Sequence, residues 1–464
     1  MAAPAPIDAE ANSDAEGAAP QPWPEPAAAW GTLAVLSVVL ALSQIDRGVI
    51  TLLVGPIKRD LRLTDSQVGL LIGLAFSLVY LFTSLPLSRL SDSRSRKWMI
   101  TAGVSFWSLA TAACGLAHSY WQMFAARAAV GVGESVNGPA TYSLLADNFP
   151  RQKLTRAMAM LNLGFIVGVA FSLIVGGMML AILEALPPVV LPGLGHVRNW
   201  QLVFFAVGLP GLLVALAMAF VPEPVRRGLH VAARSPAVPL GEVLAFLRGN
   251  IGLYGPIFVG VFLVGVETYG VQNWRPTFFE RTYHWKLAFI GQVTGWLSLV
   301  ASLIGLFLGA ALTEWLSRQR DDANLIIAVS AQSLSIPFAV AGPLMPNGWL
   351  ALACSSVGLV TAMVSAPPMV AAMQTVTPNR MRAQISSLYL IMFSGITAII
   401  GPSFLAAVTD FVFHDDAKLR YAMAASSAIM LPLGVLMNWL AVRPYGRLIA
   451  AIKAQEAQAA RLAP

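Results

Sequence analysis

The chain alternates long apolar runs with short polar loops, a pattern that predicts membrane-spanning helices along most of its length. A helix needs about 20 mainly apolar residues to cross the hydrocarbon layer of a bilayer. On that measure the sequence predicts twelve spans, at residues 30–54, 66–88, 98–117, 120–147, 154–184, 201–221, 250–274, 288–314, 323–344, 349–375, 382–408 and 420–442. The fold expected from this pattern is an all-α integral membrane protein.

The predicted spans fall into two groups of six, separated by the longest internal connection, residues 222–249. Related motifs follow the second and eighth spans, and others follow the fourth and tenth. The separation of Asp92 from Glu314 nearly equals that of Arg156 from Arg382. An internal duplication into two six-helix repeats is therefore expected, and such repeats are typical of transporters with a substrate site between the halves.

The domain organisation expected from these boundaries has five parts. They are an acidic, disordered N-terminal tail, a six-helix bundle, a cytoplasmic linker, a second six-helix bundle and a C-terminal tail, at residues 1–29, 30–221, 222–249, 250–442 and 443–464.

Composition supports the membrane interpretation, because 57% of the residues are hydrophobic and 11% are charged, against about 45–50% and about 25% in soluble domains. The net charge of +7 could suggest nucleic-acid binding. However, Lys and Arg lie mainly in loops next to apolar runs, as the positive-inside rule describes. Their distribution predicts that both termini are cytoplasmic and that nucleic acid is not a partner.

Catalytic and metal-binding signatures such as HExxH, a P-loop or GxSxG do not occur in the sequence. Cys114 and Cys354 lie apart in apolar segments, so they indicate neither a disulfide framework nor a metal site. The chain is not expected to be an enzyme or to need a cofactor or a metal.

Five charged residues interrupt the predicted spans and are the main candidates for function: Asp46, Arg47, Arg127, Glu134 and Glu267. A charge at bilayer depth costs about 2.5–3.5 kcal/mol on insertion scales, so such residues usually face a partner or a water-filled path. Arg127 and Glu134 are seven residues apart and share one helix face, about 10 Å apart along the axis. We therefore expect a charged site for substrate or protons within the membrane.

The loop after the second span, residues 88–97, is a degraded form of GxxxDRxGRK, the loop signature of the major facilitator superfamily. Asp92, Arg96 and Lys97 remain from that signature, and Glu314 occupies the equivalent place in the second repeat. We expect these four residues to form a cytoplasmic gate. The alternative is that the loop serves only as a positive-inside topology signal.

Several segments together resemble the spinster family of that superfamily and suggest a bacterial member. They are Asp46-Arg47-Gly48, residues 63–80, 106–111, 127–134 and 146–150, and the loop 221–228. Animal members of this family export sphingosine-1-phosphate and lysophospholipids. The resemblance implies that Asp46 and Glu134 are proton sites, whereas the degraded loop 88–97 departs from the pattern.

The expected function is proton-coupled transport of a lipidic or amphiphilic anion by alternating access. Arg127, Arg47 and Glu267 would bind substrate, while Asp46 and Glu134 would exchange protons. The expected partners are a small amphiphilic substrate, protons and membrane lipids, for a monomer in a bacterial inner membrane. Transport of small organic anions and multidrug export remain alternatives. A non-transporting sensor is a further one, although it would need an output domain.

Overall fold

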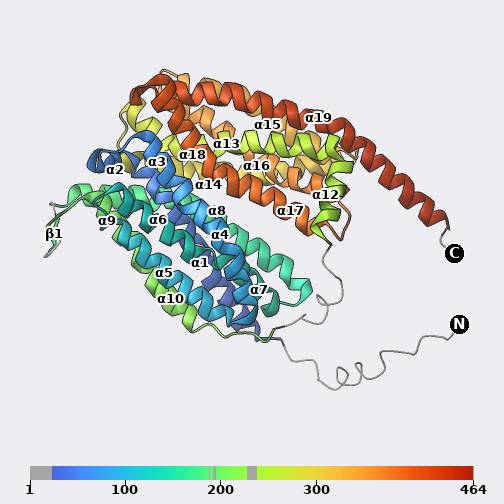
Figure 1. Ribbon diagram of the computed structural model, residues 1–464, viewed down its shortest axis with the longest axis horizontal. Helices are drawn as coiled ribbons and strands as arrows, with labels where there is room; N and C mark the ends of the chain where they lie inside the picture. The colour runs from blue at the N-terminus through green and yellow to red at the C-terminus, as the bar shows by residue number, and fades with distance from the viewer. Residues whose placement is uncertain (1–22, 188, 192–194, 227–237, 463–464) are drawn as a thin grey trace.

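The computed structural model describes residues 23–187, 189–191, 195–226 and 238–462, and they are almost entirely helical (Figure 1). The N half contains α1 (Pro26–Leu52), α2 (Val54–Leu61), α3 (Asp65–Ile72), α4 (Leu74–Ser93), α5 (Arg96–Cys114), α6 (Tyr120–Glu134), α7 (Asn137–Asn148), α8 (Arg151–Ala185), α9 (Asn199–Gly208) and α10 (Pro210–Ala219). The C half contains α13 (Ile251–Tyr283), α14 (Leu287–Ser317), α15 (Ala323–Ala341), α16 (Gly348–Val376), α17 (Arg382–Leu390), α18 (Thr397–Ala407) and α19 (Leu419–Leu462). Figure 1 shows the two halves as adjacent bundles of long helices.

Ten helical segments of the described chain are long and apolar enough to cross a membrane. The third and fourth predicted spans correspond to α5 and to α6 followed by α7. Helix α5 is less apolar because it begins with Arg96 and Lys97, whereas α6 and α7, of 15 and 12 residues, are each too short to span the membrane alone. With these segments included, all twelve predicted spans lie on helices, and the predicted all-α membrane fold is confirmed.

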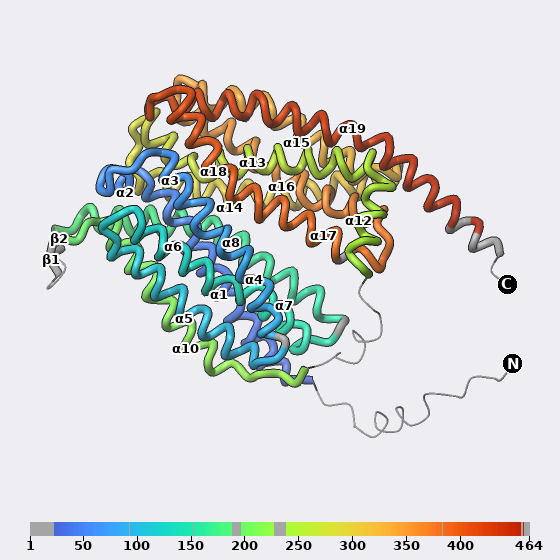
Figure 2. Tube along the Cα trace, viewed as in Figure 1, coloured from blue at the N-terminus to red at the C-terminus, as the bar shows by residue number. Residues whose placement is uncertain are grey.

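Three elements were not expected from the sequence. Strands β1 (Val189–Leu191) and β2 (Gly195–Val197) pair antiparallel between α8 and α9 in the chain. They lie at one end of the molecule in Figure 2. Helix α12 (Leu240–Gly249) lies inside the expected linker and buries Val243 in the core of the C half. Helix α19 continues through the expected C-terminal tail to Leu462.

The helix that corresponds to the eleventh span is widened twice. Between and after α17 and α18 the chain forms π-helical turns, η2 (Ile391–Ile396) and η3 (Val408–Phe413). Short 3-10 turns, η1 (Gly342–Leu344) and η4 (Asp416–Lys418), follow α15 and precede α19. Single π turns inside helices occur frequently at functional sites. In this chain η2 carries Phe393, whose ring packs against that of Tyr269 on α13.

The hydrophobic core joins the halves at only one end of the described molecule. We call the two ends the Asp65 end and the Arg96 end. One buried cluster contains Leu52 and Ile57 from the N half together with Trp274 and Phe278 from the C half, and it lies at the Asp65 end. The other two clusters lie toward the Arg96 end, and each belongs to a single half.

Glycines allow close contact between the halves where α8 crosses α14. A Cβ atom built on Gly291 would lie 2.6 Å from the carbonyl oxygen of Leu173 and 2.8 Å from Cα of Gly177. Real Cβ atoms essentially never approach so closely, so the backbones can touch only because side chains are missing at both positions. Helices α3 and α18 approach similarly, since Cβ on Gly69 would lie 2.9 Å from the carbonyl oxygen of Pro402.

Candidate functional site

Two charged residues of α1 meet two of α6 in the middle of the N half. Asp46, Arg127 and Glu134 are all buried. Arg47 Nε donates a hydrogen bond of 2.6 Å to Glu134 Oε2; the Arg47 side chain is 33% exposed and that of Glu134 is fully buried. Arg47 is thus the member of the group that a solute can reach.

Aromatic rings of α4 support both arginines. The guanidinium carbon of Arg47 lies 4.6 Å from the centre of the Phe76 ring and 4.9 Å from that of Tyr80. Arg127 also lies over Phe76, at 5.5 Å. Cation–π contacts hold a guanidinium in place without neutralising it. Both arginines therefore keep their charge for an anion or a carboxylate.

Asp46 points away from Arg47, as adjacent residues on a helix must, because they project about 100° apart. Arg127 Nη1 donates to the backbone carbonyl of Asp46 at 3.3 Å rather than to its carboxylate. Among the described residues, the donors nearest to the Asp46 carboxylate are Trp107 Nε1 and Thr111 Oγ1 of α5, although no hydrogen bond within 3.5 Å joins them. The Asp46 carboxylate is therefore separate from the Arg47–Glu134 pair and faces α5.

Close helix packing places these charges together, and the glycines of α6 make it possible. A Cβ atom on Gly131 would lie 2.6 Å from the carbonyl oxygen of Phe76 on α4. A Cβ atom on Gly133 would lie 2.8 Å from the backbone nitrogen and Cβ of Trp107 on α5. Gly131 and Gly133, which lie between Arg127 and Glu134 in the sequence, thus allow α4 and α5 to pack closely against α6.

Glu267, the last of the five charges predicted within the spans, is buried and lies in the C half on α13. Ser427 Oγ of α19 donates to Glu267 Oε1 at 2.7 Å, and among the described residues Glu267 forms no ion pair with Arg275. Arg47 and Tyr269 of α13 lie within electrostatic range. The Tyr269 ring packs against Phe393 of η2, which stacks on Tyr389. The C half therefore offers aromatic surface toward the arginine of the N half.

The expected gate residues lie at the Arg96 end, where the bonds of Arg96 and Glu314 stay within one half of the described structure. Buried Arg96 pairs with Asp147 and donates from Nε to Glu223 Oε1 at 3.0 Å. Glu314 in the last turn of α14 pairs at 2.8 Å with Arg318, which directly follows that helix. The backbone N–H of Lys97 donates to Glu223 Oε2 at 2.8 Å, and the Asp92 side chain lies outside the described residues. The structure thus places Arg96 as an anchor for the chain that leaves α10.

Glu223 collects several donors at this anchor. Burial alone would raise the pKa of its carboxyl group, but hydrogen bonds from the Ser95 hydroxyl, the Lys97 N–H and Arg96 bring the net pKa below its ordinary value. Glu223 is therefore held as a carboxylate.

Ion pairs between the halves occur instead at the Asp65 end, and sequence reasoning missed them. Asp65 of α3 accepts hydrogen bonds of 2.6 and 2.7 Å from Arg281 of α13, and one of 2.7 Å from Lys58. Lys58 also pairs with Asp416 of η4. We call Lys58, Asp65, Arg281 and Asp416 the latch. These residues occupy predicted loops and span ends, where charges usually face solvent, so sequence gave no signal for them.

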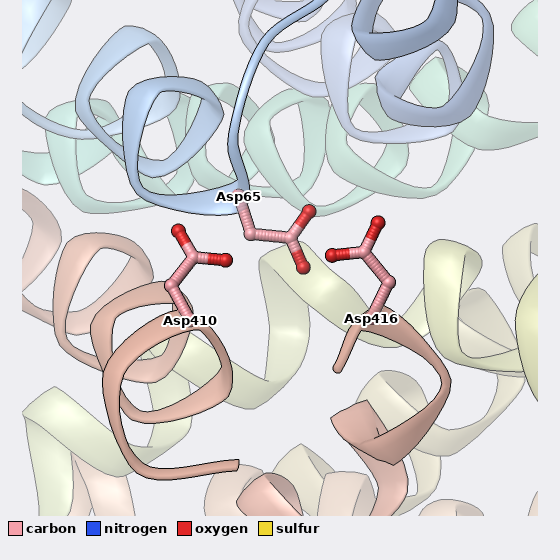
Figure 3. A group of neighbouring side chains, drawn as sticks. All are labelled: Asp65, Asp410 and Asp416. Carbon is pink, nitrogen blue, oxygen red and sulfur yellow. The ribbon is translucent and has the colours of Figure 1, made fainter. Parts of the chain in front are cut away.

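Figure 3 shows Asp65 between Asp410 and Asp416, which come from the other half. Their carboxylates lie within 4.8 Å of one another. Three carboxylates can hold a divalent cation. Here, however, Lys58 and Arg281 already neutralise Asp65, and the Ser66 N–H donates to Asp410. The trio works as part of the contact between the halves.

Comparison with known proteins gives consistent matches. Residues 36–402 match the family described as Major Facilitator Superfamily. An MFS-type efflux pump of Mycolicibacterium smegmatis is 24% identical over 91% of this chain and 94% of its own. Protein spinster homolog 1 of Xenopus laevis is 23% identical over 66% of this chain and 58% of its own.

Among solved structures, a bacterial homolog to the human lysosomal transporter Spinster, in an inward-facing and unoccupied conformation, shares the fold. Its TM-score is 0.75 at 22% identity, covering 92% of this chain and 98% of that one. The family match, the spanning helices and this likeness agree. The chain belongs to the Major Facilitator Superfamily of membrane transporters and is not an enzyme.

Proposed function

We propose that the protein couples proton movement to transport of amphiphilic anions by alternating access, as expected from its resemblance to the spinster family. The observation that carries the proposal is the pairing of the half-buried Arg47 with the fully buried Glu134, beside a buried Asp46 that forms no ion pair among the described residues. Such coupling needs an arginine that can exchange one anionic partner for another, and carboxyl groups that can take up a proton.

The coupling follows from competition for Arg47. A phosphate or carboxylate of the substrate binds the planar guanidinium through charge-assisted hydrogen bonds. Glu134 then loses its partner in a buried site, and the neutral, protonated form of its carboxyl group becomes favoured. Substrate binding therefore promotes protonation, and by linkage protonation promotes substrate binding. Asp46, which faces Trp107 and Thr111, is the second proton site in this proposal.

The apolar part of the substrate would lie against aromatic rings. Phe76 and Tyr80 flank Arg47 in the N half, and Tyr269, Tyr389 and Phe393 form an aromatic group in the C half. This combination of one accessible cation and several rings favours an anionic amphiphile over a small hydrophilic acid. It also disfavours a cationic drug, which Arg47 would repel.

The proposed setting has both termini in the cytoplasm of a bacterial inner membrane, with the Arg96 end inside and the latch outside. The moving units are the bundles at residues 30–221 and 250–442, and the working unit is a monomer. The shared core and the latch lie at the same end, which fits a state closed outside and open inside.

The test is a measurement of internal pH in sealed proteoliposomes that contain a trapped dye. Lysophospholipids, sphingoid phosphates and small organic acids are added in turn, with empty liposomes as a control for lipid-driven proton leak. Glu134→Gln should abolish substrate-dependent proton movement, whereas Glu184→Gln, at an exposed acid of α8, should not. A normal signal from Glu134→Gln would refute the proton site. A response to small acids alone would refute the amphiphile assignment.

A further inference from the structure

A cavity of about 600 Å³ lies at the Asp65 end between the two halves. Its lining includes Lys58, Arg59 and Arg62 from the segment after α1, and Arg281 and His284 from the end of α13. The carboxylates in the lining are those of Glu280 and Asp416. Groups that carry positive charge thus outnumber acids, and they come from both halves.

Two of these residues adopt a backbone conformation that L-amino acids rarely use. Arg62 follows α2 with a φ of 53°, and His284 follows α13 with a φ of 55°. The position after a helix that turns left-handed is usually glycine, which has no Cβ to clash. Arg62 and His284 have the same sequence separation as Asp92 and Glu314, so they are equivalent positions of the two repeats. Both repeats therefore place a basic side chain where glycine would suit the backbone better.

The side chains of Arg62 and His284 form no hydrogen bond or ion pair with the described residues. By contrast, Lys58 and Arg281 are held by Asp65, and Arg59 donates to Glu280 at 3.2 Å. The latch and the Arg59–Glu280 pair thus close the interface without Arg62 and His284. One unengaged donor from each half remains in the lining of the same cavity.

We propose that this cavity is a binding site for an anion with a phosphate or carboxylate group, held between Arg62 of the N half and His284 of the C half. A guanidinium offers a two-pronged donor to such a group, and an imidazole offers at least one N–H. Because the donors belong to different halves, the anion binds only while the Asp65 end is closed. It therefore raises the population of that state. The site is separate from Arg47 and Glu134 and does not depend on the identity of the transported substrate.

Glycine substitution tests this proposal, because it removes the basic group and suits the left-handed backbone. The test variant carries Arg62→Gly and His284→Gly. The matched control is His414→Gly, since His414 has a φ of 52° after η3 but is absent from the cavity lining. Closure is read from the distance between spin labels at His118→Cys and Pro346→Cys, which lie on exposed positions of the two halves at this end. Cys114→Ala and Cys354→Ala provide the background.

The probes are inorganic phosphate with protein in detergent, and phosphatidic acid in phosphatidylcholine nanodiscs without free phosphate. We expect at least one probe to increase the closed population and the thermal midpoint of the parent protein and of His414→Gly. The double glycine variant should bind that probe about tenfold more weakly or worse, with an equal or higher midpoint when no probe is present. Action of phosphatidic acid alone would assign the site to a lipid headgroup, and action of phosphate to a soluble anion.

Three results would overturn the proposal: no response of the parent protein to either probe, an unchanged response in the double variant, or a lower midpoint of that variant without any probe. The last would show that the two basic side chains serve the fold. None of these results involves the proton signal of Glu134→Gln, so the two proposals fail separately.

Discussion

Removing the central carboxylate of the latch should open the Asp65 end of the transporter. Asp65 has a fully buried side chain and receives three hydrogen bonds of 2.6–2.7 Å, two from Arg281 and one from Lys58. In Asp65→Asn the amide keeps one acceptor oxygen but loses the negative charge. Two cations from different halves then lie near each other with less compensation, and the closed arrangement loses its main polar contact.

The magnitude follows from the burial of the three groups. Breaking a buried ion pair by removing one partner is destabilising by about 3–5 kcal/mol. Arg281 and Lys58 are 15% and 16% exposed, so water partly compensates them, and the remaining amide oxygen still accepts one bond. We therefore expect a loss of about 2–3 kcal/mol for the closed state. This corresponds to a rise of about 30- to 150-fold in the ratio of open to closed molecules.

The assay is the labelling rate of a cysteine that only the open state exposes. Thr51 is buried on α1, one turn beyond Arg47 toward the latch. Thr51→Cys in a background without Cys114 and Cys354 is treated with a membrane-impermeant thiol reagent. If opening is fast relative to labelling, the rate is proportional to the open population. Asp65→Asn should raise it by the factor given above.

The matched control is Asp60→Asn. Asp60 lies at the same end and pairs with Arg198, but both residues belong to the N half. It loses the same charge without affecting a contact between the halves, so its labelling rate should stay within about twofold of the parent. An unchanged rate in Asp65→Asn, or an equal rise in both variants, would refute the assignment of the latch.

Two further predictions concern the helix crossing and the Arg96 anchor. Gly291→Ala should lower the thermal midpoint and speed the labelling of Thr51→Cys, because the added Cβ would lie 2.6 Å from the carbonyl oxygen of Leu173. Gly358→Ala is the control and should change neither quantity, because its Cβ would have no neighbouring atom within 4 Å. Equal behaviour of the two alanine variants would contradict the close crossing of α8 and α14. The depressed pKa of Glu223 contributes stability above the ordinary glutamate pKa, and this is lost as pH falls through the folded-state value. The parent protein should therefore have a higher thermal midpoint than Glu223→Gln at neutral pH, and this difference should shrink from about pH 5 downward. A difference that does not change with pH would rule out this role of the ionised carboxyl group.

Hydropathy along the chain was sufficient to predict the membrane class and the positions of the spans. Burial in lipid requires a continuous apolar segment with all backbone groups bonded internally, and this requirement is local in sequence. The same logic exposed Asp46, Arg47, Arg127, Glu134 and Glu267, because a charge within such a segment is conspicuous. Their burial, apart from the half-exposed Arg47, agrees with that reading, while their roles in transport stay predictions.

Which charges meet was decided by tertiary structure. The sequence did not specify which arginine pairs with which acid, and in the structure Arg47 bonds to Glu134 while Arg127 bonds to the backbone of Asp46. The placement of α6 contributes to this choice, and it depends on the close contacts of Gly131 with α4 and of Gly133 with α5. No spacing within one helix contains this information.

The contact between the halves was likewise invisible in the sequence. Asp65 and Arg281 are far apart along the chain and lie at the ends of ordinary helices, so neither stands out. They meet because the two bundles pack together at one end, through Gly177 and Gly291 and through the shared apolar core. The sequence by itself determined what enters the membrane and which charges enter with it. The packing of the halves determined their partners, because an ion pair depends on distances in space that hydropathy and spacing along the chain do not specify.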